Sequence, residues 1–434
     1  MVLRRKINSF HTLASKFFVS ERHRRFQESF TQETVMDTFL ARQPIFDQNH
    51  HIYGYELLFR AGEANIFPEI DGALATSKVL SSSFFTVGIE EITGGCKAFV
   101  NFTLELLLQG AALMFHPDTF VVEILEDVCP GPEVIEACRE LRARGYDIAL
   151  DDFICTCQSE IFMEFATIIK IDFRSSSIAE IKDILNRFSS HPCAFLAEKI
   201  ETHEEFHQAR ELGFRYFQGY FFSRPEMMKQ KDLSPVKQHV LQLLIRVFQD
   251  DCTVSELEEI ICRDISMSYK LLKYINSAHF ARITPLSSVR QAIAFLGMNE
   301  IRTFVTIVAT SKLCQDKPHE LLRTSIIRAR FLEHIAAEVQ RDEKEMFMLG
   351  LFSLIDAMLD NTMERLIHPL HLKNSLQKAL VKREGELFIY LEMVELYETA
   401  QWEKLDALRQ AARIAEGRLA VFYLEAISWV DKFS

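Results

Sequence analysis

The feature that most restricts the fold of this chain is a regular alternation of short apolar runs with amphipathic stretches, from Met36 to about residue 225. Short apolar runs bounded by turn residues are typical of strands, whereas apolar residues three and four positions apart are typical of helices. Pro132 to Ala143 shows the helical spacing. The predicted strands are His51 to Leu57, Ala98 to Val100, Phe120 to Ile124, Asp147 to Leu150, Thr167 to Ile171, Ala194 to Ala197 and Tyr216 to Phe222. Because the strands are apolar on both faces, we expect a parallel sheet covered by helices, as in a βα barrel or an open α/β sheet.

A polar residue lies in or next to each predicted strand, in most cases at its C-terminal end. These residues are Glu56, Asn101, Glu123, Asp151, Lys170, Glu198 and Gln218. Any one acid could simply cap the helix that follows it. Taken together, however, they lie where βα barrels and open α/β sheets build their sites. The pattern therefore predicts a converging carboxylate site.

Composition narrows the class of protein. The chain has 434 residues, more than one core usually spans, so two domains are expected. Hydrophobic residues make up 48 % and charged residues 25 %, a balance that excludes a disordered chain. The formal net charge of −12 argues against broad binding to nucleic acid, and no basic recognition helix is apparent, so DNA is not an expected partner.

Cysteine usage and hydropathy bear on the compartment. The nine Cys lack the paired spacing of a zinc site and the density of a disulfide scaffold, which fits a reducing cytoplasm. No stretch approaches the run of about 18 apolar residues that spans a bilayer, so we expect no membrane span.

The chain divides into four predicted segments. Residues 1–35 are basic and form either an arm that touches a membrane or partner, or a frayed extension upstream of a true start at Met36. Residues 36–228 carry the βα pattern, and residues 229–235 are a polar linker. Residues 236–434 show helical periodicity without a convincing strand, which predicts an all-α second domain.

Seven short motifs follow one another along the first half. They are Tyr55 to Arg60, Phe99 to Asn101, Glu123 to Glu126, Asp151 to Phe153, Ile169 to Asp172, Ala197 to Glu201 and Phe217 to Pro225. In this order they make the chain from about Met36 to Pro225 resemble the EAL domain, the βα barrel that hydrolyses cyclic di-GMP in bacteria. The resemblance implies a shortened TIM-like barrel of the EAL type, and homodimers of such barrels are expected.

The resemblance also implies roles for individual residues. Two Mg²⁺ or Mn²⁺ ions would bind an oxygen-rich ligand set, and such ions prefer oxygen donors. The implied metal ligands are Glu56, Asn101, Glu123, Asp151 and Asp152. Lys170 would orient the attacking water and Glu198 would complete a catalytic set with Glu56. Arg60 and Gln218 would hold the substrate, and Glu126 and Asp172 would support the ligands from behind.

The sequence departs from the EAL pattern at two places. After Asp152 and Phe153, where the family has glycines in a mobile loop, the chain reads Ile154, Cys155, Thr156, Cys157. Lys199 stands where the family often has glycine after the catalytic glutamate. The two cysteines could form a redox pair or metal clip, but the missing partner ligands favour no special role.

The second half contains a different set of motifs. The segments Asp264 to Leu272, Tyr274 to Ala278 and Ser287 to Ile293, closed by Leu296 and Gly297, resemble the HDOD domain, a helical module related to HD phosphohydrolases. Ser353 and Leu354 lie about where the enzyme relatives carry their His-Asp pair, so the resemblance implies a non-catalytic output domain. Asn276 to Ala278, with Pro285 and Gly297, would shape a groove for a protein partner.

Two functions remain open at this point. The first is a cytoplasmic signalling enzyme, a metal-dependent phosphodiesterase that converts cyclic di-GMP to linear pGpG. The alternative, favoured by the altered loop after Asp152, is a catalytically inactive cyclic di-GMP sensor or protein-interaction scaffold.

Overall fold

The computed structural model describes residues 38–61, 89–155, 159–225, 234–249, 251–276, 286, 288–314 and 316–431. The predicted extension 1–35, Met36, most of the linker 229–235, Cys157, Ser277, Ala278 and Pro285 lie outside these ranges. The strands are β1 (Thr38–Asp47), β2 (Ile52–Ala61), β3 (Lys97–Phe102), β4 (Phe120–Ile124), β5 (Asp147–Leu150), β6 (Ile168–Asp172), β7 (Ala194–Glu198) and β8 (Tyr216–Gln218). The helices from the barrel half are α3 (Ile89–Thr93), α4 (Leu104–Leu108), α5 (Pro132–Ala143), α6 (Ile178–Arg187) and α7 (His203–Leu212), with 3₁₀ turns η1 (Ala111–Met114), η2 (Ser159–Glu164) and η3 (Tyr220–Ser223).

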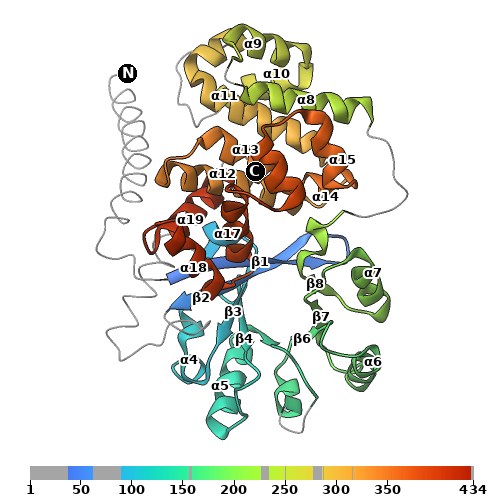
Figure 1. Cartoon of the computed structure of the whole chain (residues 1–434). Coiled ribbons are helices and arrows are strands. Elements are labelled where there is room, and N and C mark those ends of the chain that lie inside the picture. The colour runs from blue at the N-terminus through green and yellow to red at the C-terminus, as the bar shows by residue number, and fades with distance from the viewer. Residues whose placement is uncertain are drawn as a thin grey trace, which may run out of the picture. The chain divides into compact units, whose positions relative to one another are not determined.

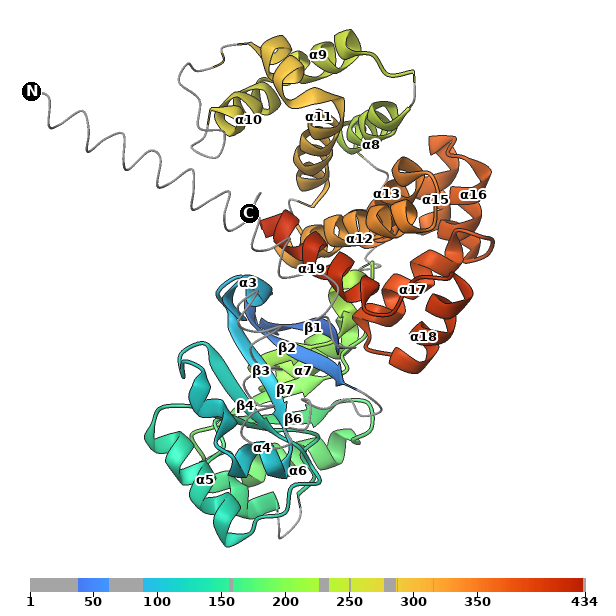
Figure 2. The ribbon, with the colours of Figure 1, turned by 90° about the vertical axis from the view of Figure 1, so that its left-hand side faces the viewer.

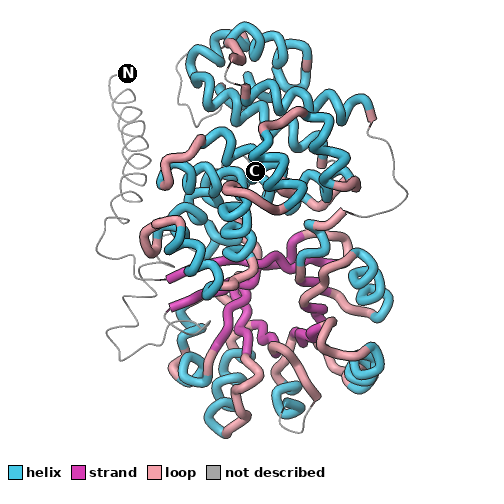
Figure 3. Tube along the Cα trace, viewed as in Figure 1, coloured by secondary structure: helices cyan, strands magenta, loops and turns pink. Residues whose placement is uncertain are grey.

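The eight strands close into a barrel in sequence order (Figure 1). Strand β1 pairs antiparallel with both β2 and β8, and the pairs from β2 through β8 are parallel. The helices that follow the parallel strands surround the ring on its outer face (Figure 3). Parallel strands covered in this way are buried on both sides, as β4 is along its whole length. The predicted α/β barrel is confirmed.

The helices begin where their sequences supply caps. Helix α5 starts with Pro132 in its first turn and buries Val134, Cys138 and Leu141, three of the residues whose spacing predicted it. Helix α6 begins with a capping box, in which the Ser177 side chain accepts from the Glu180 N–H while the Glu180 carboxylate accepts from the Ser177 N–H.

Two strand predictions require correction. Strand β1 was not predicted, and it contains Pro44, a residue that usually argues against a strand interior. The predicted strand Tyr216 to Phe222 ends at Gln218. Gly219 follows with φ 142°, and an added Cβ there would lie 2.0 Å from the Ile200 carbonyl oxygen, so the backbone turns into η3.

Among its described residues, the second half contains helices joined by turns and no strand. It contains α8 (Pro235–Phe248), α9 (Val254–Arg263), α10 (Ile265–Ile275), α11 (Val289–Leu313), α12 (His319–Glu338), α13 (Glu343–Phe352), α14 (Ile355–Leu359), α15 (Met363–Ile367), η5 (His368–Leu370), α16 (Asn374–Gln377), the π-helical turn η6 (Lys378–Lys382), α17 (Phe388–Glu398), α18 (Trp402–Ala411) and α19 (Arg418–Asp431). Leu257, Leu271, Ile293 and Val305 belong to one core formed by α8 to α11. The predicted all-α half is confirmed.

Helix α11 is the one described helix that is long and apolar enough to cross a membrane, and half of its most apolar 18-residue stretch is buried. It is broken at Gly297, where φ is 81° and ψ is 167°. The break leaves pieces of eight and sixteen residues, both shorter than the roughly 20 residues that a span requires.

The chain forms two compact units whose boundary differs from the predicted one. The barrel unit contains residues up to Ile200, Ala209–Gly219 and, in addition, the described residues from Tyr397 onward. The Tyr397 hydroxyl donates to the Leu40 carbonyl of β1 over 2.9 Å, and α19 packs against β1 and α3 (Figure 2). The C-terminal helices therefore pack with the barrel, although they follow the helical half in sequence.

Candidate functional site

The polar residues of the site form one layer inside the barrel. Next to this layer, toward the N-terminal ends of the parallel strands, lies an apolar layer. It contains one residue from each of seven strands: Ile45, Phe99, Val121, Ala149, Ile168, Leu196 and Tyr216. Two positions further along the parallel strands, on the same side of the backbone, come Asn101, Glu123, Asp151, Lys170, Glu198 and Gln218. On the antiparallel strand β1 the equivalent position precedes Ile45 and is Gln43.

Strand β2 adds Glu56 to this layer. Glu56 pairs in register with Gln43 on one side and Phe99 on the other. Two residues earlier the strand has Gly54, where an added Cβ would lie 2.6 Å from the Lys97 carbonyl oxygen and 3.0 Å from the Phe99 ring. The crowded interior below the site therefore requires a glycine at this position.

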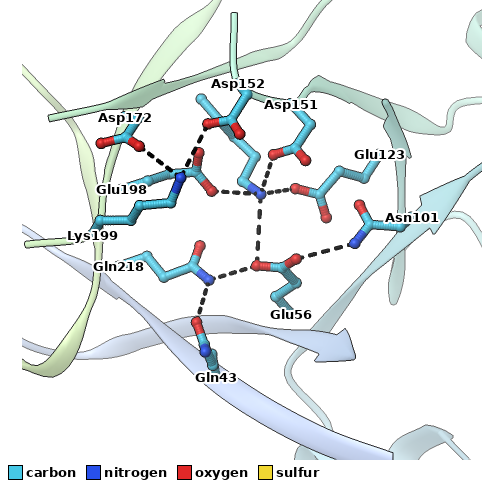
Figure 4. A network of polar contacts seen from close by, with 11 residues as sticks. Gln43, Glu56, Asn101, Glu123, Asp151, Asp152, Asp172, Glu198, Lys199 and Gln218 are labelled. Carbon is cyan, nitrogen blue, oxygen red and sulfur yellow. Dashed lines mark hydrogen bonds and ion pairs between the residues drawn. The ribbon is translucent and has the colours of Figure 1, made fainter. Parts of the chain in front are cut away.

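Figure 4 shows Glu56, Glu123, Asp151 and Glu198 pointing toward a common point inside the barrel. Lys170 lies among these carboxylates and is 1 % exposed. Its Nζ lies 2.7 Å from Asp151 Oδ1, 2.7 Å from Glu198 Oε1 and 3.6 Å from Glu56 Oε2. It also forms an ion pair with the fully buried Glu123. Four carboxylates from four strands therefore converge on one buried ammonium.

A second set of contacts fixes Glu56. Gln218 Nε2 donates to Glu56 Oε2 over 2.5 Å and to Gln43 Oε1 over 3.1 Å. Asn101 Nδ2 donates to Glu56 Oε1 over 3.2 Å. The sequence analysis missed Gln43 because the strand that carries it was not recognised.

Burial and mutual repulsion shift the protonation of these carboxylates. Desolvation raises the pKa of Glu198 to about 8, an effect that Lys170 opposes and that Asp151 and Glu56 reinforce. Desolvation likewise raises the pKa of Glu123 well above its usual range. Although burial disfavours an ammonium, the surrounding carboxylates raise the pKa of Lys170. These shifts favour the charged form of Lys170 and the protonated forms of Glu198 and Glu123.

The donor set fits a divalent cation of the oxygen-preferring kind. One oxygen each of Glu56, Glu123 and Glu198 lie within 4.8 Å of one another. Asn101 Oδ1 and Glu123 Oε2 are buried and accept no hydrogen bond from the described residues. Buried oxygens normally find a partner, so these atoms indicate a ligand that carries positive charge.

Comparisons with known proteins agree with this geometry. The family model of the EAL domain matches residues 98–225, and that of the HDOD domain matches residues 233–386. The uncharacterized protein YuxH of Bacillus subtilis is 36 % identical over 91 % of this chain and 98 % of its own length. The cyclic di-GMP phosphodiesterase CdgJ of Vibrio cholerae is 37 % identical over 86 % of this chain and 88 % of its own length. The chain belongs to the EAL–HDOD family.

A solved structure is similar to part of this EAL–HDOD protein. The Bacillus subtilis YkuI protein, which has an EAL domain and was solved with c-di-GMP and calcium, is 21 % identical. The match covers 62 % of this chain and 73 % of that one, with a TM-score of 0.33.

The other residues named from the EAL resemblance lie at or beyond the rim of the layer. Asp172 Oδ2 accepts from Lys199 Nζ over 2.6 Å, and Asp152 Oδ1 lies 3.5 Å from the same Nζ. Burial would raise the pKa of Asp172, but Lys199 and the backbone N–H groups of Ser175 and Arg174 hold it at about 2. The sequence analysis noted Lys199 but did not place it in the site.

The structure does not test the roles expected of two further site residues. Glu126 is exposed in the turn after β4, and its expected support of the ligands stays a prediction. The backbone of Arg60 lies in β2 and pairs with Phe39 of β1, and the Arg60 side chain is not described.

The described residues of the HDOD half contribute no acid to a group with metal-binding spacing. Ser353 ends α13 and donates to the Gly350 carbonyl over 2.7 Å, and Leu354 is 4 % exposed. Within the described ranges, the acidic group with metal-binding spacing is the barrel's Glu56, Glu123 and Glu198. Asp356 in α14 is half-buried, and desolvation raises its pKa to about 6.

Proposed function

We propose that this EAL–HDOD protein is a metal-dependent phosphodiesterase that hydrolyses cyclic di-GMP to linear pGpG. The observation that carries the proposal is the buried layer in which carboxylates converge on Lys170 and several oxygens accept no hydrogen bond. The name of the relative CdgJ supports the substrate.

Mg²⁺ or Mn²⁺, bound by Glu56, Asn101, Glu123, Asp151 and Asp152, would activate water and neutralise charge that develops on the phosphoryl oxygens. The net reaction adds water at phosphorus, breaks one P–O3′ bond of the ring and leaves a 5′-phosphate and a 3′-hydroxyl.

The protein's own residues divide the remaining tasks. Lys170 is held in place by four carboxylates, so its charge is fixed near the attacking water without reorganisation. Glu198 has a pKa of about 8 in this setting, which suits a group that exchanges a proton near neutral pH. Gln218 keeps its Nε2 on Glu56 and Gln43, which leaves Oε1 as an acceptor for the nucleotide. We assign Arg60 to a phosphate of the substrate.

The HDOD half is proposed as the output module. Ser353 and Leu354 cannot replace a His-Asp metal pair, so this half would bind a protein partner instead. Among the described residues, Cys138, Cys252 and Cys314 are buried thiols outside any disulfide, which supports a reducing, cytoplasmic setting.

A non-catalytic cyclic di-GMP sensor is the second candidate. It is favoured by the loop after Asp152, where Ile154 is 73 % exposed in place of a glycine. Glycine allows backbone conformations that a β-branched residue resists, so this loop follows a different path from that of the family.

Chromatography of cyclic di-GMP incubated with the full chain distinguishes the two. The phosphodiesterase forms pGpG with Mg²⁺ or Mn²⁺ and forms none in EDTA, and Glu56→Gln abolishes the product. Calorimetric binding of cyclic di-GMP without turnover in either cation would replace the enzyme with the sensor.

A further inference from the structure

Lys199 has an unusual backbone for its residue type. It follows Glu198 directly at the end of β7 and has φ +56°, in the left-handed region. A residue with a Cβ adopts this region reluctantly, whereas glycine enters it freely. A lysine retained in a strained conformation beside a site suggests that its side chain has a task there.

The contacts of Lys199 identify the groups on which it acts. Its Nζ donates to Asp172 Oδ2 over 2.6 Å and lies 3.5 Å from Asp152 Oδ1 (Figure 4). Asp172 is further held by the backbone N–H groups of Arg174 and Ser175, which donate to Oδ1 over 2.8 and 3.0 Å. Lys199 is therefore anchored on Asp172 and reaches Asp152 from there.

Asp152 has little else in the described structure to balance its charge. Its Oδ1 is buried and accepts no hydrogen bond from the described residues, and its backbone has φ +39°. Lys170 serves the neighbouring carboxylates Asp151, Glu123 and Glu198 but forms no ion pair with Asp152 among the described contacts. Lys199 is accordingly the cation that offsets Asp152 here.

Lys170 and Lys199 reduce the negative charge of the site. The carboxylates of the layer and rim, Glu56, Glu123, Asp151, Asp152, Asp172 and Glu198, total −6 when ionised, and Lys170 with Lys199 reduces this to −4. A positive charge beside one ligand repels an incoming divalent cation and competes for the ligand's oxygen. Lys199 is about half exposed, so its effect is screened but not abolished.

We infer that Lys199 is a positioning residue that occupies Asp152 in place of a divalent cation, which makes the Asp152 side the weaker of two cation positions. The inference rests on the metal site of the proposed function. The position supplied by Glu56, Asn101 and Glu123 lies on the far side of the layer from Lys199 and fills first. The second cation binds only when it displaces the lysine from Asp152.

Titration calorimetry with MnCl₂ alone, on the full chain without nucleotide, tests the inference. Wild type should bind one Mn²⁺ tightly and a second more weakly. Lys199→Met should tighten the second event about tenfold, the size expected for one charge a few ångströms from a divalent ion in a water-like dielectric. Lys199→Arg should match wild type. Lys199→Gly suits the left-handed backbone and should behave as Lys199→Met, which guards against misfolding of the methionine variant.

Lys182→Met is the matched control, because Lys182 lies on the exposed side of α6 and its loss changes the net charge equally. If Lys199→Met and Lys182→Met bind Mn²⁺ alike, or if Lys199→Met binds it more weakly, the inference is overturned while the proposed function stands. If wild type binds no Mn²⁺, both are overturned.

Discussion

Replacing Lys170 with methionine removes the one ammonium that balances the buried carboxylate layer while keeping most of the side-chain volume. At an effective dielectric constant of 20, each 2.7 Å contact of Nζ, with Asp151 and with Glu198, corresponds to about 6 kcal/mol of Coulomb energy. Desolvation of the buried groups offsets much of this sum. Because the carboxylates stay behind without their partner, we expect Lys170→Met to lower the free energy of unfolding by about 3–5 kcal/mol at pH 8 in EDTA.

The chain offers a probe and a control for this measurement. Both tryptophans, Trp402 and Trp429, lie in the unit that contains the barrel, so their fluorescence during urea denaturation reports on that unit. Lys97→Met removes a lysine from a partly exposed ion pair with Asp147 and should cost about 1 kcal/mol or less. The deficit of Lys170→Met should shrink at pH 5, where carboxyls protonate, and on addition of Mn²⁺. A loss no larger than that of Lys97→Met, or one that is the same at pH 5 and pH 8, would refute the reasoning.

Three further predictions follow from the same contacts. Glu123→Gln removes one charge from a buried cluster of four carboxylates and one lysine. It should therefore stabilise the metal-free protein at pH 8 by about 1–2 kcal/mol and abolish Mn²⁺ binding. An unchanged melting curve with Mn²⁺ binding intact contradicts this. Glu198 has a pKa of about 8 in the folded protein and 4.5 in the unfolded chain, so the folded state binds its proton more tightly. The resulting stabilisation is complete below pH 4.5 and is lost as the pH rises to 8. Denaturation in EDTA should therefore show a loss of about 3–5 kcal/mol between pH 4.5 and 8, whereas a flat profile would remove the buried carboxyl from the account. Tyr397→Phe leaves the Leu40 carbonyl without its 2.9 Å hydrogen bond and should cost about 1 kcal/mol in the tryptophan-monitored transition; no change would mean that this bond does not help to fasten the C-terminal helices to β1.

Much of the barrel could be predicted because its strands are uniformly apolar and its site residues lie at strand ends. Glu123, Asp151 and Lys170 follow their apolar-layer neighbours by two positions, and the two-residue period of a strand suffices to direct them to one place.

The rest depends on tertiary contacts that leave no local signal. Strand β1 contains Pro44 and is antiparallel to both of its neighbours, so no local pattern marks Gln43 as a site residue. The pairing of β1 with β2 and β8 is what brings Gln43 to the site. The strand at Tyr216 ends early because the Ile200 backbone approaches Gly219. The association of the C-terminal residues with the barrel rests on long-range contacts: Tyr397 at the end of α17 bonds to Leu40, 357 positions away in the chain, and α19 packs against β1 and α3.

The central claim is that the carboxylate layer around Lys170 binds divalent cations. Anomalous diffraction from crystals grown with Mn²⁺ measures this directly, because manganese scatters anomalously and the protein's light atoms scarcely do. The account predicts peaks inside the barrel within about 2.2 Å of oxygens of Glu56, Asn101, Glu123 and Asp151. Manganese found only on surface carboxylates, with the interior of the barrel free of peaks, would contradict it.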